Sequence, residues 1–411
     1  MNYITSVTQF HSQEFIMGGA QKSMLHPYED HDTTFGELLS LAKTFARGGT
    51  FNEKMDGCNL TWRFRDNKFY LARNYEHFRT GGQSIEDYRT YLKGHPAEDQ
   101  FGRALDRLER MRNVLKATQF FDDYDDGVWV NMEVIDKKAP QMLRYDIDCF
   151  VIHSLWRFVE KPKPHTEIVK PTSMSLNRFS SILCLSGVRV LHAPTVTVPR
   201  MEFTHFYHFR NYITCLMREY DLGLENTLED YIYESVKDIL YPENISRRDT
   251  EMLAENVTGR GKHDIRKIRE DYDEGTHELI NKYCLSSNRL KTINRILGPI
   301  KNCWLQFGAK RLDGVVSSLI TDADRSKERL DDIIEWNINV VNDNRKENPS
   351  IYNGFYEQLE KFCTMDVEPQ IIEGFVFETD RYIVKLTGAF QSLNRITGTA
   401  RYQFGELFEE K

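Results

Sequence analysis

One short segment of the sequence has residue types and spacing that could support covalent chemistry. In Phe51–Asn59 (FNEKMDGCN), Lys54 is followed by Asp56 and Gly57 in the pattern K-x-D-G. A lysine amine acts as a nucleophile when it is neutral. The pattern alone is weak evidence, because four positions with one wildcard arise by chance in a chain of this length on the order of one time in ten.

A near copy of the pattern shows how weak it is. Lys310–Gly314 (KRLDG) has one extra residue and lies in a helical sequence, where a surface charge and a helix end explain it. Lys54 differs because other polar residues follow it in order. They are Arg73 after the next strand, Glu133 in VWVNMEVI, Glu373 before GFVF and Lys385 in YIVKL.

Strand alternation gives three of these residues an unusual position. Glu133 shares a strand face with Trp129 and Asn131, Glu373 with Ile371, Phe375 and Phe377, and Lys385 with Ile383 and Thr387. A charged group on a half-buried β surface is unfavourable unless something binds it. We therefore expect these side chains to face a ligand.

The ordered set resembles the covalent nucleotidyltransferase superfamily, which includes ATP-dependent DNA and RNA ligases and mRNA capping enzymes. Its members carry a nucleophilic lysine in K-x-D-G, an arginine after the next strand, a glutamate-bearing strand, an aromatic-bearing strand, an E-G-hydrophobic-V strand and a terminal K-hydrophobic strand. Five of these six elements are recognisable within residues 50–155 and 370–390. The aromatic strand, at 148–153, is matched loosely.

Further residues resemble one branch of that superfamily. Asn59 lies five residues after Lys54, as in the K-x-(D/H)-G-x-N form of the RNA ligases that seal nicks. Leu71–Asn74 followed by Phe78–Gly81 is also similar to that branch, and Leu386–Gly398 resembles uncharacterised ligase-like proteins of large tailed phages. The resemblance implies an RNA ligase that acts in the cytoplasm of an infected host cell. It would use ATP and Mg²⁺, with Mn²⁺ as an alternative metal.

The resemblance also implies a role for each residue. Lys54, with its pKa lowered by Lys385 and a bound Mg²⁺, would hold AMP as a phosphoamide and pass it to a 5′-phosphate, from which a 3′-hydroxyl displaces it. Glu133 and Glu373 would bind the metal. The expected nucleotide contacts are Glu53, Asp56, Gly57, Arg73, Glu133, Phe150 as the stacking partner of the base, and Lys385. Asn59 would contact nucleic acid.

Two departures from the family pattern bear on the substrate. Ligases usually end the set with K-x-K, whereas Lys385 stands alone, and the roughly 25 residues that follow are too few for the OB domain of DNA ligases and capping enzymes. RNA is therefore a more probable partner than DNA. Two alternatives stay open: nucleotide transfer to a protein, a small molecule or an RNA end without sealing, and a catalytically inactive protein that binds nucleic acid or a phage partner.

The pattern of elements predicts an α+β fold, with a ligase-type antiparallel-sheet core split by a large helical insertion. Short strands are expected at 60–64, 69–73, 128–135, 148–153, 371–377 and 382–387, and helices at 35–46, 100–116 and 330–341. The predicted parts are a helical lead-in at 1–50, core residues 51–159, the insertion at 160–365, and core residues 366–411.

Composition sets outer limits. The 411 residues include 54 Lys+Arg and 62 Asp+Glu, a net charge of −8, and are 40% hydrophobic, which excludes collagen-like, coiled-coil and fully disordered chains. No apolar run is long enough to span a membrane, and the N-terminus does not resemble a signal peptide, so we expect a soluble intracellular protein with no membrane partner. The sequence does not define an oligomeric state.

An acidic chain that binds nucleic acid needs a local basic surface. The stretch 260–311 is the first place to look for one, although a solvated helical face is the simpler interpretation. His205 and His208, with no cysteine or acidic ligand near them, predict a hydrated helix surface more than a metal site.

Overall fold

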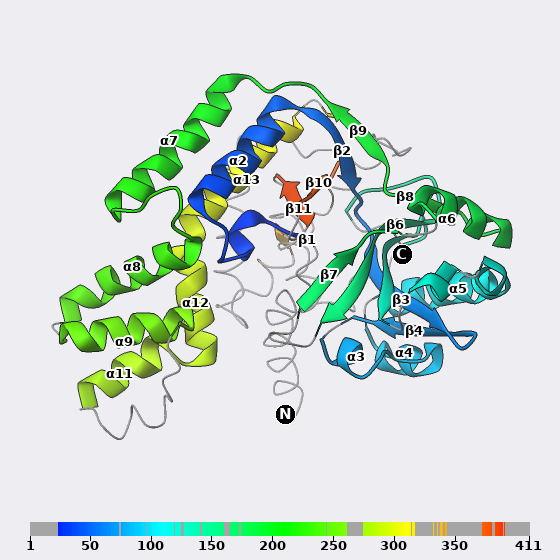
Figure 1. The fold of residues 1–411 in the computed structure, drawn as a ribbon, viewed down its shortest axis with the longest axis horizontal. Coiled ribbons are helices and arrows are strands. Elements are labelled where there is room, and N and C mark those ends of the chain that lie inside the picture. The colour runs from blue at the N-terminus through cyan, green and yellow to red at the C-terminus, as the bar shows by residue number, and fades with distance from the viewer. Residues whose placement is uncertain are drawn as a thin grey trace. The chain divides into compact units, whose positions relative to one another are not determined.

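The computed structural model divides into two compact units (Figure 1). Unit 1 comprises Met1–Met24, Thr50–Val198 and Gly308–Lys411, and unit 2 comprises Leu25–Gly49 and Pro199–Phe307. The structure describes residues 24–316 except 74, 96, 119, 125–126, 140–141, 160–164, 172–173, 244, 261–273 and 314, together with 332, 335, 338–339, 342, 372–379, 383–388 and 390. Both units are described within those residues.

The smaller sheet of unit 1 joins strands from distant parts of the chain. Its strand order is β1-β11-β10-β2-β9. The strands are β1 (Met24–Leu25), β2 (Gly49–Lys54), β9 (Thr195–Val198), β10 (Gly374–Glu378) and β11 (Ile383–Thr387). Strand β10 is antiparallel to both β2 and β11, with Gly374 opposite Lys54 and Val376 opposite Lys385.

The larger sheet has the order β4-β3-β5-β6-β7, and β8 pairs with β6. Its strands are β3 (Cys58–Arg65), β4 (Lys68–Ala72), β5 (Val128–Ile135), β6 (Cys149–Val159), β7 (His165–Val169) and β8 (Val190–His192). All pairs are antiparallel except the parallel pair of β6 with β8. With helices packed outside two mainly antiparallel sheets, the predicted α+β class is confirmed.

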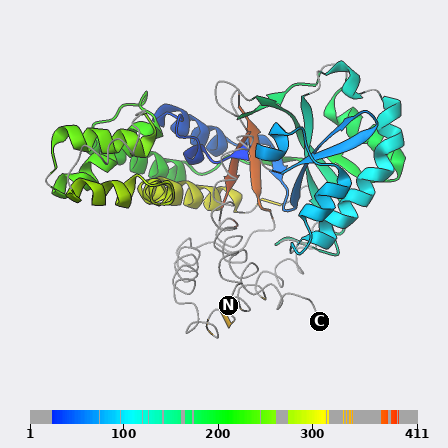
Figure 2. The same ribbon diagram turned by 90° about the horizontal axis from the view of Figure 1, so that it is seen from below.

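Helices cover one face of the larger sheet (Figure 2). They are α4 (Ile85–Tyr91), α5 (Glu98–Thr118) and α6 (Leu176–Leu183), with the 3₁₀ turns η2 (Phe120–Asp123) and η3 (Cys184–Ser186). Helix α3 (Tyr75–Arg79) instead packs Phe78 on Trp129, on the opposite face of the sheet. Side chains of α4, α5 and α6, such as Tyr88, Leu105 and Phe179, pack on Trp62 and Val130 of the sheet. Burial of this apolar face is the main contribution to the stability of unit 1.

The pairing of β5 with β6 contains a bulge. Asn131 lies opposite Ser154, whereas Met132 lies opposite Ile152, so His153 has no residue opposite it. A bulge inserts one residue into one strand and redirects its side chain. In this chain the bulge places a histidine next to the strand that carries Glu133.

Local signals explain why two predicted elements form where they do. Helix α2 (Phe35–Arg47) begins at Thr34, whose hydroxyl accepts a hydrogen bond from the Glu37 backbone N–H, while the Glu37 carboxylate accepts one from the Thr34 backbone N–H. Asp66 and Asn67 join β3 to β4 with φ of 50° and 58°, as a two-residue hairpin turn of the mirror-image type I class requires. The helix predicted at 35–46 and the strands predicted at 60–64 and 69–73 are confirmed.

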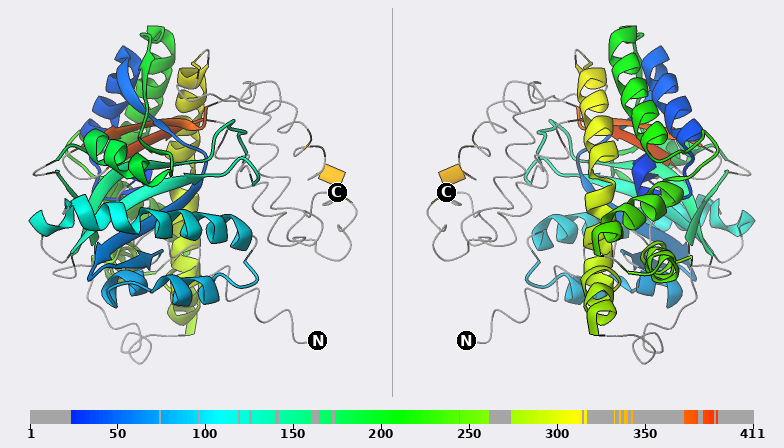
Figure 3. Two further views of the ribbon diagram at one scale, coloured as in Figure 1. Left: turned by 90° about the vertical axis from the view of Figure 1, so that its right-hand side faces the viewer. Right: turned by 90° about the vertical axis from the view of Figure 1, so that its left-hand side faces the viewer.

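Unit 2 is helical. Besides α2 it contains α7 (Phe203–Glu219), α8 (Leu228–Leu240), α9 (Arg247–Thr258), α11 (Glu274–Tyr283), α12 (Ser286–Ile296), η1 (Pro27–Glu29), η4 (Tyr241–Glu243) and most of α13 (Gly298–Leu312), which enters unit 1 at Gly308. Helices α2, α7 and α13 lie side by side (Figure 3), and the Trp304 ring is 6.2 Å from Phe45 and 5.7 Å from Phe209. No helix in the described ranges is long and apolar enough to cross a membrane.

The divisions between the parts differ from the predicted ones. Residues 165–198 belong to unit 1, because β6 continues to Val159 and pairs with β7, which the Pro- and Lys-rich composition of 160–164 concealed. Helix α2 belongs to unit 2, where it packs on α7, and is not a lead-in to the sheets. The predicted helix at 330–341 lies largely outside the described residues.

Replacing Gly57, which links β2 to β3, tests this packing. A Cβ atom on Gly57 would lie 2.7 Å from the Val134 carbonyl oxygen and 2.9 Å from Ile135 Cδ1, both on β5. We expect Gly57→Ala to lower the free energy of unfolding by about 1–3 kcal/mol, measured by urea denaturation. Gly127→Ala, whose Cβ would come no closer than 3.6 Å to Arg157, is the control, and equal effects of the two would contradict the prediction.

Candidate active site

The end of β2 and the start of β10 bring Lys54 and Glu373 together. Because Gly374 lies opposite Lys54, the preceding residue reaches the lysine, and Lys54 Nζ is 2.6 Å from Glu373 Oε1. The two side chains are 16% and 8% exposed. The sequence placed these residues in one site, and the structure joins them in a largely buried ion pair.

Glu133 extends this charged group from the larger sheet. It lies on β5 opposite Asn59, whose side chain lowers the pKa of the Glu133 carboxyl, and it is buried. Burial raises the pKa of Glu133 to about 8; the Lys54 ammonium opposes this rise and Glu373 adds to it. The predicted residues Lys54, Glu133, Glu373 and Asn59 therefore lie close together.

The pKa of Lys54 is raised in the structure, whereas the resemblance implies that it is lowered. Burial by itself lowers the pKa of the amine, but the carboxylates of Glu373 and Glu133 outweigh burial and raise the pKa above 10.5. Lys54 is therefore an ammonium ion at neutral pH in the protein alone. Nucleophilic attack requires a change that neutralises the glutamates, because they are the cause of the raised pKa.

His153 is a further member of the site. Its Nε2 lies 3.9 Å from Glu133 Oε1, and neither ring nitrogen has a hydrogen-bond partner among the described residues. Burial lowers the pKa of His153 to about 3, and Lys54 adds to the effect, so the ring is neutral. Sequence reasoning missed His153 because a bulge is not visible in strand alternation; a polar residue in the apolar run CFVIHSLW was the available signal.

Four buried polar atoms of this sheet face lack hydrogen-bond partners within the described residues. They are Asn131 Oδ1, Glu133 Oε2 and both ring nitrogens of His153. Asn131 is held by its other amide atom, since Nδ2 donates to Thr61 Oγ1 over 3.1 Å. Buried polar atoms are nearly always hydrogen-bonded, so several unsatisfied ones beside a charged lysine favour a ligand-binding function.

Asp56 of the K-x-D-G pattern secures a loop beside the site. Its Oδ2 accepts hydrogen bonds of 2.6 Å from the backbone N–H groups of both Met142 and Leu143, and its own N–H donates to the Tyr145 hydroxyl over 3.2 Å. Burial and the nearby Glu373 raise the pKa of Asp56 to about 7. The structure thus gives Asp56 a role in local architecture, and Gly57 closely approaches β5.

The predicted site residues Lys385 and Glu53 lie on opposite faces of the smaller sheet. Residues opposite one another share a face, so Lys54, Gly374 and Thr387 lie on one face, and Lys385, two residues before Thr387, lies on it too. Glu53 is fully buried on the opposite face, where it pairs with Phe375. Lys385 therefore has the predicted orientation toward the side of Lys54.

The structure places two predicted nucleotide contacts elsewhere. Phe150 pairs with Val134 on the apolar face of the larger sheet, is fully buried, and lies 5.9 Å from the Arg107 guanidinium. The prediction that Phe150 stacks on a base is therefore wrong, because the strand directs this side chain into the core. Arg73 lies over the Phe101 ring at 5.5 Å, on the side of α4 and α5.

Glu133 and Glu373 are the residues that would hold a metal ion. Among the described residues no group of three or more His, Cys, Asp or Glu side chains could hold one. Mg²⁺ commonly uses only one or two carboxylates and completes its shell with water and phosphate oxygens. The unsatisfied Oε2 of Glu133 beside the Glu373 carboxylate fits that kind of shared site.

No protein-family model and no curated protein matches this chain. The site is therefore interpreted from its own geometry and charge, together with the sequence pattern. These point to a buried, polar, strongly charged surface centred on one lysine.

Glu133→Gln is expected to flatten the pH dependence of stability. The pKa of Glu133 is raised from 4.5 to about 8, so the folded protein holds a proton that the unfolded chain releases at lower pH. That stabilisation is complete below pH 4.5 and is lost as the pH rises through 8. Between pH 5 and 8, Tm should fall by about 2–4 °C more in the wild type than in the variant.

The control is Glu378→Gln, which changes an exposed glutamate at the end of β10. Its Tm should follow the wild-type curve across the same range. If Glu133→Gln also ran parallel to the wild type, the raised pKa of Glu133 would be wrong.

Proposed function

We propose that this protein is an ATP- and Mg²⁺-dependent polynucleotide ligase that acts on RNA through AMP bound covalently to Lys54. The observation that carries the proposal is the Lys54–Glu373 ion pair of 2.6 Å beside Glu133, on a sheet face with unsatisfied buried polar atoms. A buried lysine needs one carboxylate as its counter-ion, and a second buried carboxylate leaves a surplus of negative charge that a bound metal ion would offset. The ordered sequence pattern supports the same reaction class.

The first step requires loss of a proton from the Lys54 ammonium to solvent, once a bound cation offsets the carboxylates that raise its pKa. The neutral amine then attacks the α-phosphorus of ATP. A nitrogen–phosphorus bond forms while the bond to the β-phosphate oxygen breaks, and pyrophosphate leaves. Mg²⁺ held by Glu133 and Glu373 would neutralise these carboxylates and the negative charge of the phosphates.

The second and third steps transfer AMP and seal the strand. An oxygen of the 5′-phosphate attacks the same phosphorus, the bond to Lys54 breaks, and the amine regains a proton. A 3′-hydroxyl then attacks the activated 5′-phosphate, and AMP leaves. Lys385, on the same face as Lys54, would contribute positive charge near the phosphates, and Asn59, exposed beside Glu133, would contact the nucleic acid.

The raised pKa of Lys54 favours a second candidate. If the ion pair with Glu373 persists when a nucleotide binds, the amine stays protonated and forms no covalent bond. The protein would then be a ligase-like molecule that binds nucleic acid without catalysis. The two candidates differ in one observable, the covalent bond to Lys54.

Lys54→Ala is expected to abolish covalent labelling. Wild-type protein, treated with pyrophosphate to remove any AMP already bound, is incubated with α-labelled ATP or GTP and Mg²⁺ and run on a denaturing gel. Label should remain on the wild type with ATP and be lost in Lys54→Ala. Lys310→Ala is the matched control, because Lys310 lies in α13 within the near copy of the pattern. This variant should be labelled as the wild type is.

Each of the other results would support a different function for this protein. No label on the wild type with either nucleotide would overturn the ligase proposal in favour of the binding protein. Label without joining of a nicked RNA duplex or of single-stranded RNA ends would indicate nucleotide transfer without sealing.

His153→Leu is expected to separate stability from nucleotide binding. Removing two unsatisfied nitrogens should leave Tm unchanged or raise it, because leucine needs no hydrogen bonds. The ATP concentration for half-maximal labelling of Lys54 should rise about tenfold or more, if the ring hydrogen-bonds the nucleotide. His153→Gln, which keeps a donor and an acceptor, should show a smaller rise; equal labelling by all three proteins would contradict the prediction.

A further inference from the structure

Helix α7 in unit 2 exposes aromatic side chains that its packing does not use. Phe206, Phe209 and Ile213 bury one face of the helix. On another face Phe203 and Tyr207 are 49% and 48% exposed, with ring centroids 6.0 Å apart. Large neighbouring aromatic rings in water, on a helix already fixed by its apolar face, mark an interaction surface.

One arginine lies over these rings, and two more follow along the helix. The Arg200 guanidinium lies 4.1 Å from the Phe203 ring centroid, and Arg210 and Arg218 are exposed further along α7. Their spacing of seven and fifteen residues from Phe203 keeps them on the same side of the helix. The carboxylates of this segment, Glu202 and Glu219, lie at its two ends.

A fourth arginine lies at the aromatic end. The Met201 backbone N–H donates a hydrogen bond of 2.9 Å to the Ala46 carbonyl oxygen, which brings Arg200 next to the exposed Arg47 at the end of α2. We call Arg47, Arg200, Phe203, Tyr207, Arg210 and Arg218 the α7 surface. It is cationic although the whole chain has a net charge of −8.

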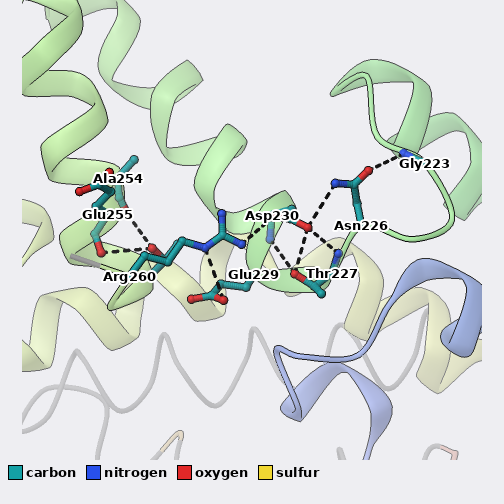
Figure 4. A network of polar contacts seen from close by, with 9 residues as sticks. Gly223, Asn226, Thr227, Glu229, Asp230, Ala254, Glu255 and Arg260 are labelled. Carbon is teal, nitrogen blue, oxygen red and sulfur yellow. Dashed lines mark hydrogen bonds and ion pairs between the residues drawn. The ribbon is translucent and has the colours of Figure 1, made fainter. Parts of the chain in front are cut away.

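In the basic stretch 260–311, two of the arginines make contacts within unit 2. Arg260 pairs with Asp230 at 2.5 Å and Glu229 at 3.4 Å (Figure 4), and Arg289 Nε donates to the Val257 carbonyl oxygen. These two guanidinium groups stabilise unit 2 internally. The arginines of the α7 surface, by contrast, point their charge toward solvent.

We propose that the α7 surface binds single-stranded RNA. Bases of a single strand have free faces that stack on exposed aromatic rings, and arginines contact phosphates and stack on bases as well. A duplex does not expose the faces of its bases to the rings. An acidic protein partner would pair with the arginines but would not account for the two neighbouring aromatic rings. Along α7 the surface extends for about 22 Å, which accommodates a few nucleotides.

The single-strand preference follows from the rings and the charge, whereas the choice of RNA over DNA rests on the proposed function. Binding at α7 does not require chemistry at Lys54. A strand held there would keep an RNA substrate on the protein between catalytic steps.

The test measures fluorescence anisotropy of a labelled 12-nucleotide single-stranded RNA with the full-length protein, over a series of salt concentrations. Phe203→Ala/Tyr207→Ala should weaken binding about tenfold or more. Arg210→Ala should lower the slope of log Kd against log salt by about 0.7. The control is Tyr241→Ala/Arg248→Ala, which removes another exposed tyrosine and arginine from unit 2 and should leave both quantities unchanged.

Several outcomes would overturn the proposal. They are equal binding by the wild type and Phe203→Ala/Tyr207→Ala, equal affinity for the blunt duplex of the same sequence, and absence of binding by the wild type. Self-association that Phe203→Ala/Tyr207→Ala abolishes, measured by light scattering, would assign the surface to a second copy instead.

The same variants separate this proposal from the ligase proposal. If wild-type protein fails to label with ATP but Phe203→Ala/Tyr207→Ala still loses RNA binding, the α7 surface stands and the ligase proposal falls. If labelling succeeds and RNA binding is insensitive to the α7 variants, the reverse holds.

Discussion

A single ammonium group surrounded by buried carboxylates determines the character of unit 1. Lys54 pairs directly with Glu373, and Glu133 and Asp56 contribute to its electrostatic environment. Burial raises the pKa values of Glu133 and Asp56 to about 8 and about 7, and the surplus of negative charge from three acids around one base adds to the effect. In water such a cluster would be hydrated; in the protein it needs protons, a cation or a ligand to be stable.

The same short segment connects the two sheets and the chemistry. Lys54 ends β2 in the smaller sheet, and four residues later Cys58 begins β3 in the larger one. Between them Asp56 holds the loop at Met142 and Leu143, and Gly57 allows β5 to pass within contact of the backbone. Lys54, Asp56 and Gly57 of K-x-D-G therefore each have a structural role, and the close approach at Gly57 brings Glu133 toward Lys54.

Sequence reasoning succeeded where physical rules act over a few residues. The helix predicted at 35–46, the strands predicted at 60–64 and 69–73 and the alternation that aligns Lys385 with Thr387 depend on local hydrogen bonds, φ values and strand geometry. It failed at the bulge, because inserting His153 into β6 depends on pairing with β5, and the adjacent Phe150 was taken for the site residue. It also misplaced the boundary near residue 160, since short strands become recognisable only by their partners.

The sequence by itself determined which residues have chemical capacity and the α+β class, because residue type and periodicity are properties of the chain. Tertiary structure decided which of these residues meet: Lys54 with Glu373 through the pairing of β2 and β10, and Glu133 with Asn59 through that of β5 and β3. It also decided their ionisation. A pKa depends on burial and on charges a few ångströms away in space, and neither is encoded in the spacing of residues along the chain.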